Sequence, residues 1–493
     1  MKLTLEPIEK TRLEAVQALI ILAEQDKTLG SLPKDRMALQ PQLQSILKSQ
    51  SAKVLTESLE WISTPSILLV ACQFPQKKGL GREERLRLAA NRLVDFQKSR
   101  SLSRIAIALD QADILEFRAI CEGLHISSYE FRKYKTDKKP QTDPEVVLLV
   151  SSDALKRSTA ALAETETVCR QINACRDLVN EPGSVLDPQA FVEYARKAAK
   201  SAALGVKIRD EKKLAGEGFL GLCTVGKGSD KPPRMVTLTY EGNRARKAGA
   251  TARHLVFVGK GITFDTGGIS IKPSQGMWEM KSDMAGAATA LTALCAIAAL
   301  ELPLKASAVL CLAENRPGNA AVLPGDIFTA KNGKTIMVDN TDAEGRLVLT
   351  DGLAEAELLG ATHVIDLATL TGAIVRALGP AVAGLFSNDS GFSQTIVKAG
   401  ESVGEKFCAI PLEEEYREYL DDPVADMKNV GKPEAGAITA ALFLQEFIPP
   451  KAAWSHLDIA GTAFTTSAWK YFKPGGTGWG VKTLVEVARV LST

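Results

Sequence analysis

Two carboxylates and a guanidinium fall two residues apart in the stretch VDNTDAEGRLVL, at Asp342, Glu344 and Arg346. The β-branched and apolar run 334–339 before them predicts a strand, and the apolar spacing of 345–359 after them predicts a helix. In an extended connection these side chains would project to one side, about 7 Å apart per step. Such a concentration of charge is costly without a cation, so the pattern indicates a cation site. The alternative for this stretch is a solvated acidic loop with an arginine partner.

A second group of ionisable residues lies upstream, where a buried-type strand at 255–258 ends in a glycine-punctuated loop. This part of the chain presents Lys260, Asp265, Lys272 and Asp283. Ligands of α/β sheets bind where strands end, so we expect both groups at one site. The four carboxylates are hard oxygen ligands, which suit two divalent ions about 3.5–4 Å apart with bridging carboxylates. A neutral Lys260 amine could add a nitrogen ligand, because an adjacent dication favours its deprotonation.

The motifs around these residues resemble those of the leucyl aminopeptidase family, also called the cytosol aminopeptidase family. The family signature NTDAEGRL stands intact at 340–347. The other stretches that look like this family are VGKGITFDTGGISIKPS (258–274), MKSDMAGAA (280–288), IDLATLTGA (365–373), ADMKNVGK (425–432) and HLDIAGTAF (456–464). The resemblance is strong over about residues 170–490 and weak over the first 165.

This resemblance implies a dinuclear metalloaminopeptidase with two Mn²⁺ or Zn²⁺ ions per subunit. It places one ion on Lys260, Asp265, Asp283 and Glu344, and the other on Asp265, Asp342 and Glu344. Asp265 and Glu344 would therefore bridge the two ions. Divalent ions in such a pair lower the pKa of water and polarise a peptide carbonyl group.

The same resemblance assigns two cationic side chains and a substrate pocket. Lys272 would stabilise the developing oxyanion. Arg346 would hold a bicarbonate ion that serves as general base, and its planar fork suits that anion better than a lysine. The substrate's free α-amine would lie near Asp283, which implies peptides with an unblocked N-terminus. The pocket for the first side chain would be formed by Met280, Thr369, Gly372, Ala460 and Ala463. Those residues are mostly small or apolar, so we expect Leu- or Met-like residues to be accepted.

Composition indicates an ordinary globular protein, with 45% hydrophobic and 24% charged residues and a net charge of +2. The eight cysteines lack CxxC pairing and mostly lie in apolar runs, which favours buried thiols in a reducing cytosol. The N-terminus does not have a signal-peptide pattern, and no apolar run approaches the roughly 20 residues that span a bilayer. We therefore expect a cytoplasmic protein with no membrane partner, and the family resemblance implies a role in intracellular peptide turnover.

Strand-like and helix-like runs alternate along 1–150, which indicates a small α/β domain. A helix from about 153 to 178 is expected to join it to a second α/β domain. We predict an N-terminal α/β domain at 1–165 and a dimetal catalytic peptidase domain at 166–493, whose mostly parallel or mixed sheet is flanked by helices. The Gly-x-Gly within 222–233 is interpreted as part of a turn between strands, because a strand and no helix follows it.

Several other functions are weighed against this one. The four histidines lack metal-ligand spacing, which excludes HExxH and Cys/His zinc sites, and His456 is interpreted as a hydrogen-bonded core residue. A two-metal phosphoesterase would normally recruit histidines as well as carboxylates. DNA binding is possible but unsupported, because the basic stretch 132–140 is typical of a solvated linker loop.

One stretch departs from the family pattern. Residues 314–326 carry Gly318, Asn319 and Leu323 where the family has other residues, and none of the three is an expected ligand. Family members are typically hexamers, so the resemblance also implies a homohexamer.

Overall fold

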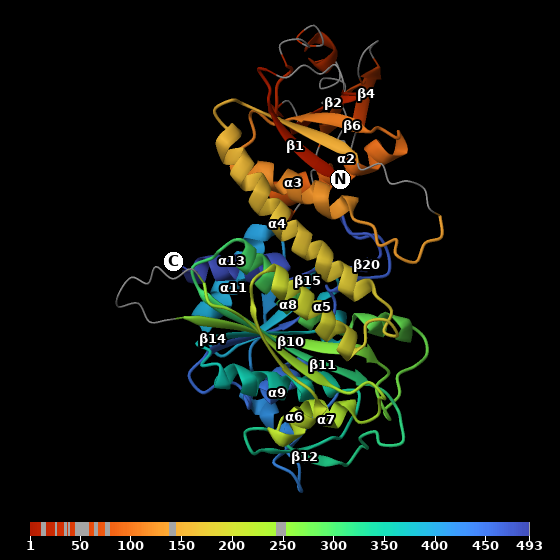
Figure 1. The fold of residues 1–493 in the computed structure, drawn as a ribbon, viewed down its shortest axis with the longest axis vertical. Coiled ribbons are helices and arrows are strands. Elements are labelled where there is room, and N and C mark those ends of the chain that lie inside the picture. The colour runs from red at the N-terminus through yellow and green to blue at the C-terminus, as the bar shows by residue number, and fades with distance from the viewer. Residues whose placement is uncertain are drawn as a thin grey trace. The chain divides into compact units, whose positions relative to one another are not determined.

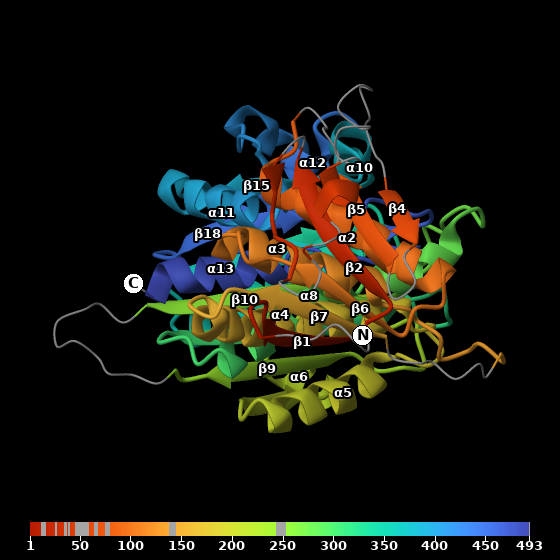
Figure 2. The ribbon, with the colours of Figure 1, turned by 90° about the horizontal axis from the view of Figure 1, so that it is seen from above.

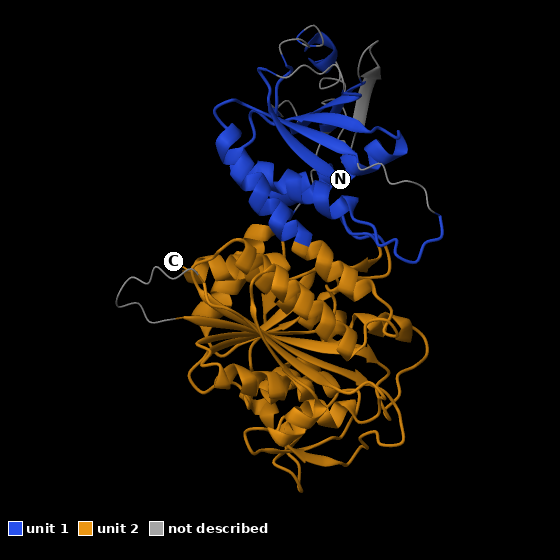
Figure 3. Ribbon diagram, viewed as in Figure 1, with its two compact units in different colours: residues 1–170, 468–473 blue, residues 171–467, 474–493 orange. Residues whose placement is uncertain are grey.

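The computed structural model describes residues 1–10, 16–24, 27–33, 37, 40–44, 59–63, 68–73, 79–137, 144–242 and 253–492. Contacts divide the chain into two compact units, Met1–Arg170 with Ala468–Lys473 and Gln171–Ser467 with Pro474–Thr493 (Figure 3). Both units combine helices with largely parallel strands (Figure 1), so the predicted α/β class is confirmed. The division into an N-terminal domain and a catalytic domain at residue 165 stays a prediction.

Within its described residues, the first unit has a seven-stranded sheet in the order β1-β7-β6-β2-β5-β4, with β3 paired to β2. Its strands are β1 (Lys2–Pro7), β2 (Ala18–Glu24), β3 (Lys27–Thr28), β4 (Leu59–Ser63), β5 (Leu68–Gln73), β6 (Arg104–Ala108) and β7 (Glu145–Val150). Its helices are α2 (Arg82–Ser99), α3 (Ile114–Ser128) and the first part of α4 (Leu155–Asn180). Strand residues such as Ile20 and Ile107 share one apolar cluster with these helices. The helix α3 begins at a capping box between Asp113 and Glu116.

A late segment of the chain, Ala468–Lys473, also belongs to the first unit. Lys470 Nζ lies 2.7 Å from Glu84 Oε1, and the Tyr471 hydroxyl lies 3.3 Å from Glu84 Oε2. Arg87 in turn pairs with Glu84 at 3.2 Å. The sequence did not predict this return of the chain, because no local pattern identifies the partner of a buried glutamate.

In its described part, the second unit has an eight-stranded sheet in the order β16-β15-β18-β14-β10-β11-β9-β8. Its strands are β8 (Gly205–Arg209), β9 (Arg234–Tyr240), β10 (His254–Asp265), β11 (Lys305–Asn315), β14 (His363–Ala368), β15 (Val382–Ser387), β16 (Lys406–Ala409) and β18 (Ala453–Asp458). The four central strands are mutually parallel, and the next strand on each side, β15 and β9, runs antiparallel to them. The central strands read as apolar runs because helices cover both of their faces.

Those helices form two layers (Figure 1). One layer contains α5 (Pro188–Ser201), α8 (Ala285–Ala299), α11 (Ser390–Val403) and α13 (Val481–Ser492). The other contains α6 (Glu211–Gly216), α7 (Leu220–Gly226), α9 (Glu344–Leu358) and α12 (Gly436–Gln445), the last of which shares an apolar cluster with α7 and α9. Seen from above, α11 and α13 lie side by side (Figure 2).

Shorter elements complete the second unit. They are η2 (Met277–Ser282), β12 (Ile327–Thr329), β13 (Thr335–Met337), α10 (Gly372–Leu378), η3 (Glu414–Leu420), β17 (Met427–Lys428), β19 (Phe464–Thr465) and β20 (Gly475–Gly476). The prediction that His456 is a hydrogen-bonded core residue is confirmed, because its buried Nδ1 lies 2.5 Å from Asp366 Oδ1.

The prediction of a turn at 222–233 is wrong in its first part, where the chain forms α7. The start of α7 is completed from another helix: the Leu222 N–H donates to the Asp351 carboxylate at 2.7 Å. This cap is a tertiary contact, so the local pattern could not show it.

One segment passes the length and composition test for a membrane span, contrary to the expectation that no apolar run approaches that length. It is Met277–Ala299, which joins η2 to α8. Its apolar window is 94% buried within the structure, as in the core helix of a folded domain. Helix α8 packs against the sheet strands β10 and β11 and against helix α13, which explains why it is apolar on all sides.

The basic stretch 132–140 lies only partly among the described residues, because 138–140 fall outside them. Arg132 lies 2.7 Å from Asp137 and 3.5 Å from Glu130. These ion pairs agree with the interpretation of a solvated loop, and they offset the charge of Arg132.

Candidate functional site

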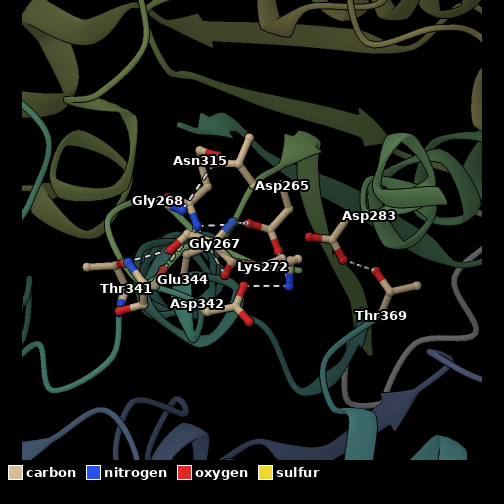
Figure 4. A network of polar contacts seen from close by, with 12 residues as sticks. Asp265, Gly267, Gly268, Lys272, Asp283, Asn315, Thr341, Asp342, Glu344 and Thr369 are labelled. Atoms are coloured by element: carbon tan, nitrogen blue, oxygen red, sulfur yellow. Dashed lines mark hydrogen bonds and ion pairs between the residues drawn. The ribbon is translucent and has the colours of Figure 1, made fainter. Parts of the chain in front are cut away.

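The two predicted groups of ionisable residues meet at the carboxyl ends of the central strands (Figure 4). Lys260 and Asp265 are on β10, whose pairing with β11 shifts register before Asp265. Asp283 follows η2, and Thr369 follows β14. Side chains from separate strand ends converge here because parallel strands all end at one edge of the sheet.

Lys260 lies at the buried end of the cluster. Its Nζ lies 2.8 Å from Asp283 Oδ2 and 2.8 Å from Glu344 Oε1. It also donates to the Thr369 carbonyl at 3.0 Å, and the Thr369 hydroxyl donates to Asp283 Oδ1 at 2.7 Å. Burial alone would lower the pKa of Lys260, but the charges of Asp283 and Glu344 raise it above its ordinary value. The metal-free side chain is therefore an ammonium group.

Lys272 occupies an equivalent position at the more open end. Its Nζ lies 2.8 Å from Asp265 Oδ2 and 2.5 Å from Asp342 Oδ1. The side chain is 21% exposed, compared with 4% for Lys260. Each lysine thus places one positive charge between two carboxylates.

The cluster remains short of positive charge, because four carboxylates face two ammonium groups. Burial and the charge of Glu344 raise the pKa of Asp265 to about 6. Burial, followed by the charge of Glu344, also raises the pKa of Asp342. Oxygen atoms of Asp265, Asp342 and Glu344 all lie within 4.8 Å of one another. A compact set of oxygen donors with unmet negative charge fits divalent cations.

The extended geometry predicted for Asp342, Glu344 and Arg346 is wrong. Glu344 is the first residue of α9, and Arg346 is on its first turn. Residues two positions apart on a helix do not face the same side, so Arg346 points to other partners. Its Nη1 donates to the Asn429 carbonyl at 2.7 Å.

The Arg346 guanidinium is buried, and its Nε has no hydrogen-bond partner among the described residues. Burial lowers the pKa of Arg346 to about 10, so the group stays charged at neutral pH. A buried N–H without a partner is costly, and a small anion would satisfy it. This arrangement fits the predicted bicarbonate at Arg346, which stays a prediction.

The five predicted pocket residues lie on segments around the cluster. Met280 is on η2, Thr369 and Gly372 follow β14, and Ala460 and Ala463 follow β18. Thr369 contacts the carboxylate cluster directly through Asp283. The assignment of all five to one substrate pocket stays a prediction.

Two asparagines at the site were missed by the sequence analysis. Asn315, the last residue of β11, donates to Asp265 Oδ1 at 2.8 Å and to the Thr341 carbonyl at 3.0 Å. Asn429 accepts from the Asp339 N–H at 2.9 Å. Both lie in segments that were recognised, and a polar residue at the end of a buried strand was the available signal for Asn315.

Comparison with known proteins agrees with this geometry. The model of the cytosol aminopeptidase family, catalytic domain, matches residues 173–485. A probable cytosol aminopeptidase of Geotalea uraniireducens is 41% identical over 424 residues, covering 84% of this chain and 84% of that protein. The chain belongs to the cytosol aminopeptidase family.

Two solved structures resemble this chain over nearly its whole length. The bottromycin maturation enzyme BotP in complex with Mn is 32% identical, with a TM-score of 0.84, covering 97% of this chain and 100% of that one. A mutant of tomato leucine aminopeptidase is 29% identical, with a TM-score of 0.84, covering 99% of this chain and 96% of that one.

Family membership makes the chain an aminopeptidase, a hydrolase that uses a divalent metal cofactor. The resemblance found in the sequence is thereby confirmed, as is the enzyme class. The matched region includes every residue to which the sequence assigned a role. The individual roles of those residues stay predictions.

The variant Gly345→Ala tests whether stability and activity require the Lys260 side chain to pass as close to position 345 as it does. A Cβ at position 345 would lie 2.7 Å from Lys260 Cε and 2.8 Å from its Nζ. Lys260 is held by three buried contacts, so we expect the free energy of unfolding to fall by about 1–3 kcal/mol, with a loss of peptide hydrolysis. Urea unfolding and hydrolysis of leucine p-nitroanilide would measure both.

The control for this variant is Gly216→Ala, where an added Cβ meets nothing within 4 Å. Alanine generally stabilises a helix relative to glycine by roughly 0.5–1 kcal/mol. A Gly345→Ala protein as stable as Gly216→Ala and fully active would show that Lys260 is not confined there.

Proposed function

We propose that this aminopeptidase releases unblocked N-terminal residues, preferring Leu and other apolar ones, by means of two divalent ions. The observation that carries the proposal is the pair of lysine ammonium groups, each placed between two carboxylates of one cluster. Two positively charged positions in one compact set of oxygen donors match the demand of a two-ion site.

The residues that would hold the first ion are Lys260, Asp265, Asp283 and Glu344, and those for the second are Asp265, Asp342 and Glu344. When bound, the ions would lower the pKa of water and polarise the peptide carbonyl. Mn²⁺ is supported by the related enzyme BotP, whose structure is a complex with Mn. Zn²⁺ is the second candidate.

Two cationic side chains would act on the reacting groups. Lys272 is partly exposed at the open end of the cluster, where its ammonium could donate to the oxyanion that develops on the carbonyl. Arg346 has a buried Nε free to donate, which supports a bound bicarbonate as general base. A bidentate anion there would accept a proton from the attacking water.

Recognition of the N-terminus would depend on Asp283. Its two oxygens already accept from Thr369 and pair with Lys260, so the carboxylate is fixed in orientation. A free α-amine beside it would be favoured, whereas an acylated nitrogen would lack the basicity that the carboxylate recognises. The side chain of the first residue would contact Met280, Thr369, Gly372, Ala460 and Ala463.

We further propose a homohexamer in the cytoplasm that takes part in peptide turnover, with the catalytic domain at 166–493. The family name supports the cytoplasmic location, and membership of an aminopeptidase family supports the role in peptide turnover. Peptides with a free N-terminus would be its partners.

The test compares leucine amide with N-acetyl-leucine amide as substrates. We expect hydrolysis of the free amine to exceed that of the acetylated compound by at least about 10³-fold, which corresponds to about 4 kcal/mol of transition-state stabilisation. Activity should vanish with a chelator and return with Mn²⁺ or Zn²⁺. Equal rates on both compounds would contradict recognition of the amine, and activity that survives the chelator would contradict the two-ion site.

A further inference from the structure

Asn315 occupies a position between the two groups of predicted metal ligands. It is the last residue of β11 and the register partner of Asp265 on β10. The side chain is 1% exposed. Figure 4 shows its amide turned toward the carboxylates. It is neutral and is not itself a predicted ligand, so its place at the centre of the cluster calls for another role.

The amide Nδ2 of Asn315 reaches both segments that carry carboxylates. It lies 2.8 Å from Asp265 Oδ1, 3.0 Å from the Thr341 carbonyl and 3.4 Å from Glu344 Oε2. The two amide protons serve these three acceptors, so the longer bond to Glu344 shares a proton with a shorter one, and together the bonds join the end of β10 to the start of α9. The carboxylates of Asp265 and Glu344 are thereby held on either side of one donor group.

The backbone of Asn315 is fixed as well. Its carbonyl accepts from the Thr266 N–H at 2.9 Å and from the Thr266 hydroxyl at 2.9 Å. On the other side of the amide, a Cβ at Gly268 would lie 2.7 Å from Asn315 Oδ1, and Gly268 has a φ of +67°. Only glycine fits both that approach and that conformation, so the amide is clamped with its N–H groups toward the carboxylates.

A neutral donor suits this location better than a charged one. Two buried carboxylates repel each other, and a hydrogen bond to each lowers the cost of bringing them together. A lysine or arginine would do the same but would compete with a bound cation for the same oxygens. An amide leaves the negative charge of Asp265 and Glu344 undiminished.

We propose that Asn315 is a positioning residue that sets the separation and orientation of Asp265 and Glu344, and so the affinity for both metal ions. This inference rests on the proposed two-ion function, in which those two carboxylates are shared. Groups that orient metal ligands typically contribute about 10–100-fold to metal affinity. Because it contacts both shared ligands, Asn315 should affect both binding steps.

The test is calorimetric titration of the metal-free full-length protein with Mn²⁺. We expect Asn315→Ala to weaken both binding steps by about 10–100-fold. Asp283→Asn serves as a comparison, because Asp283 is assigned to one ion and should weaken one step. Melting temperatures of the metal-free proteins are measured in parallel, since a residue with a merely structural role would lower them without changing the affinities.

Asn388→Ala is the matched control. Asn388 also makes two bonds to the backbone, at 3.2 Å to the Ala452 carbonyl and at 2.7 Å from the Trp454 N–H, and it lies beyond the end of β15. Its removal should leave the Mn²⁺ affinities unchanged. If Asn315→Ala does not fold, Asn315→Ser keeps one donor and is expected to weaken both steps by a smaller factor.

The outcomes separate this inference from the proposed function. Mn²⁺ binding by Asn315→Ala, or by the serine variant, that equals wild type in both steps would overturn the inference alone. A loss confined to one step would also overturn it. Failure of the wild-type protein to bind Mn²⁺ would overturn the two-ion site and the inference together.

Discussion

Replacing Glu344 by glutamine is expected to lower peptide hydrolysis by at least about 10³-fold, or about 4 kcal/mol, while the protein stays folded. Burial opposes ionisation of Glu344, but the charges of Lys260 and Lys272 outweigh it and lower its pKa. The native side chain is therefore a carboxylate, with one oxygen 2.8 Å from Lys260 and the other 3.4 Å from Asn315. Glutamine has nearly the same shape but lacks the charge that both ions would share.

The measurement is the rate of leucine amide hydrolysis at saturating Mn²⁺, with the melting temperature of the metal-free protein as the test of folding. Glu357→Gln is the matched control, because Glu357 is on the same helix but exposed. That variant should keep wild-type activity. Turnover by Glu344→Gln within a few-fold of wild type would refute its role as a shared ligand.

The sequence alone could predict that the carboxylates converge, for a reason specific to α/β sheets. Asp265 is the last residue of a strand of apolar residues and Thr369 follows another, and parallel strands end at one edge of the sheet. Strand and helix periods are local properties, so they indicate where each segment ends. These periods do not show which segments lie next to each other in the fold. The resemblance to a family supplied that information.

Two kinds of feature could not be predicted from the sequence: the residue at which a helix begins, and side-chain contacts between distant segments. Helix α9 begins at Glu344, one residue before the helix predicted from the apolar spacing. A negative charge at the start of a helix is favourable, and a pattern of apolar residues does not reveal that effect. Asn315 and Asn429 act through contacts with distant segments. Asparagine is also common in turns. An asparagine at the end of a strand can therefore belong to an ordinary loop or make several hydrogen bonds at a site, and the residue type alone does not distinguish the two.

Replacing Asp351 by asparagine is expected to make stability less dependent on pH. Asp351 is fully buried on α9, and its carboxylate accepts from the Leu222 N–H at the start of α7. Burial raises the pKa of Asp351 from 3.8 to about 7. Between these values the folded protein keeps a proton that the unfolded chain has released, so this group loses its stabilising contribution as pH rises toward 7.

Asparagine offers the same carbonyl oxygen to Leu222 without titrating. The free energy of unfolding of Asp351→Asn relative to wild type should therefore increase between pH 4 and pH 7 by roughly 2–4 kcal/mol and stay constant above pH 8. Urea unfolding in a series of buffers would measure this difference.

Asp210→Asn is the control that separates burial from capping. The Asp210 carboxylate also accepts from a backbone N–H at a helix start, that of Lys213 at 2.9 Å, but it lies at the surface and is partly exposed. The bond from Lys213 lowers the pKa of Asp210, so its contribution is present above the ordinary value of 3.8 and lost only in acid. This variant should show a constant difference from wild type between pH 5 and pH 8. A similarly constant difference for Asp351→Asn would mean that the buried carboxylate on α9 is ionised throughout, and that its contacts with α7 are strong enough to hold a full charge in the core.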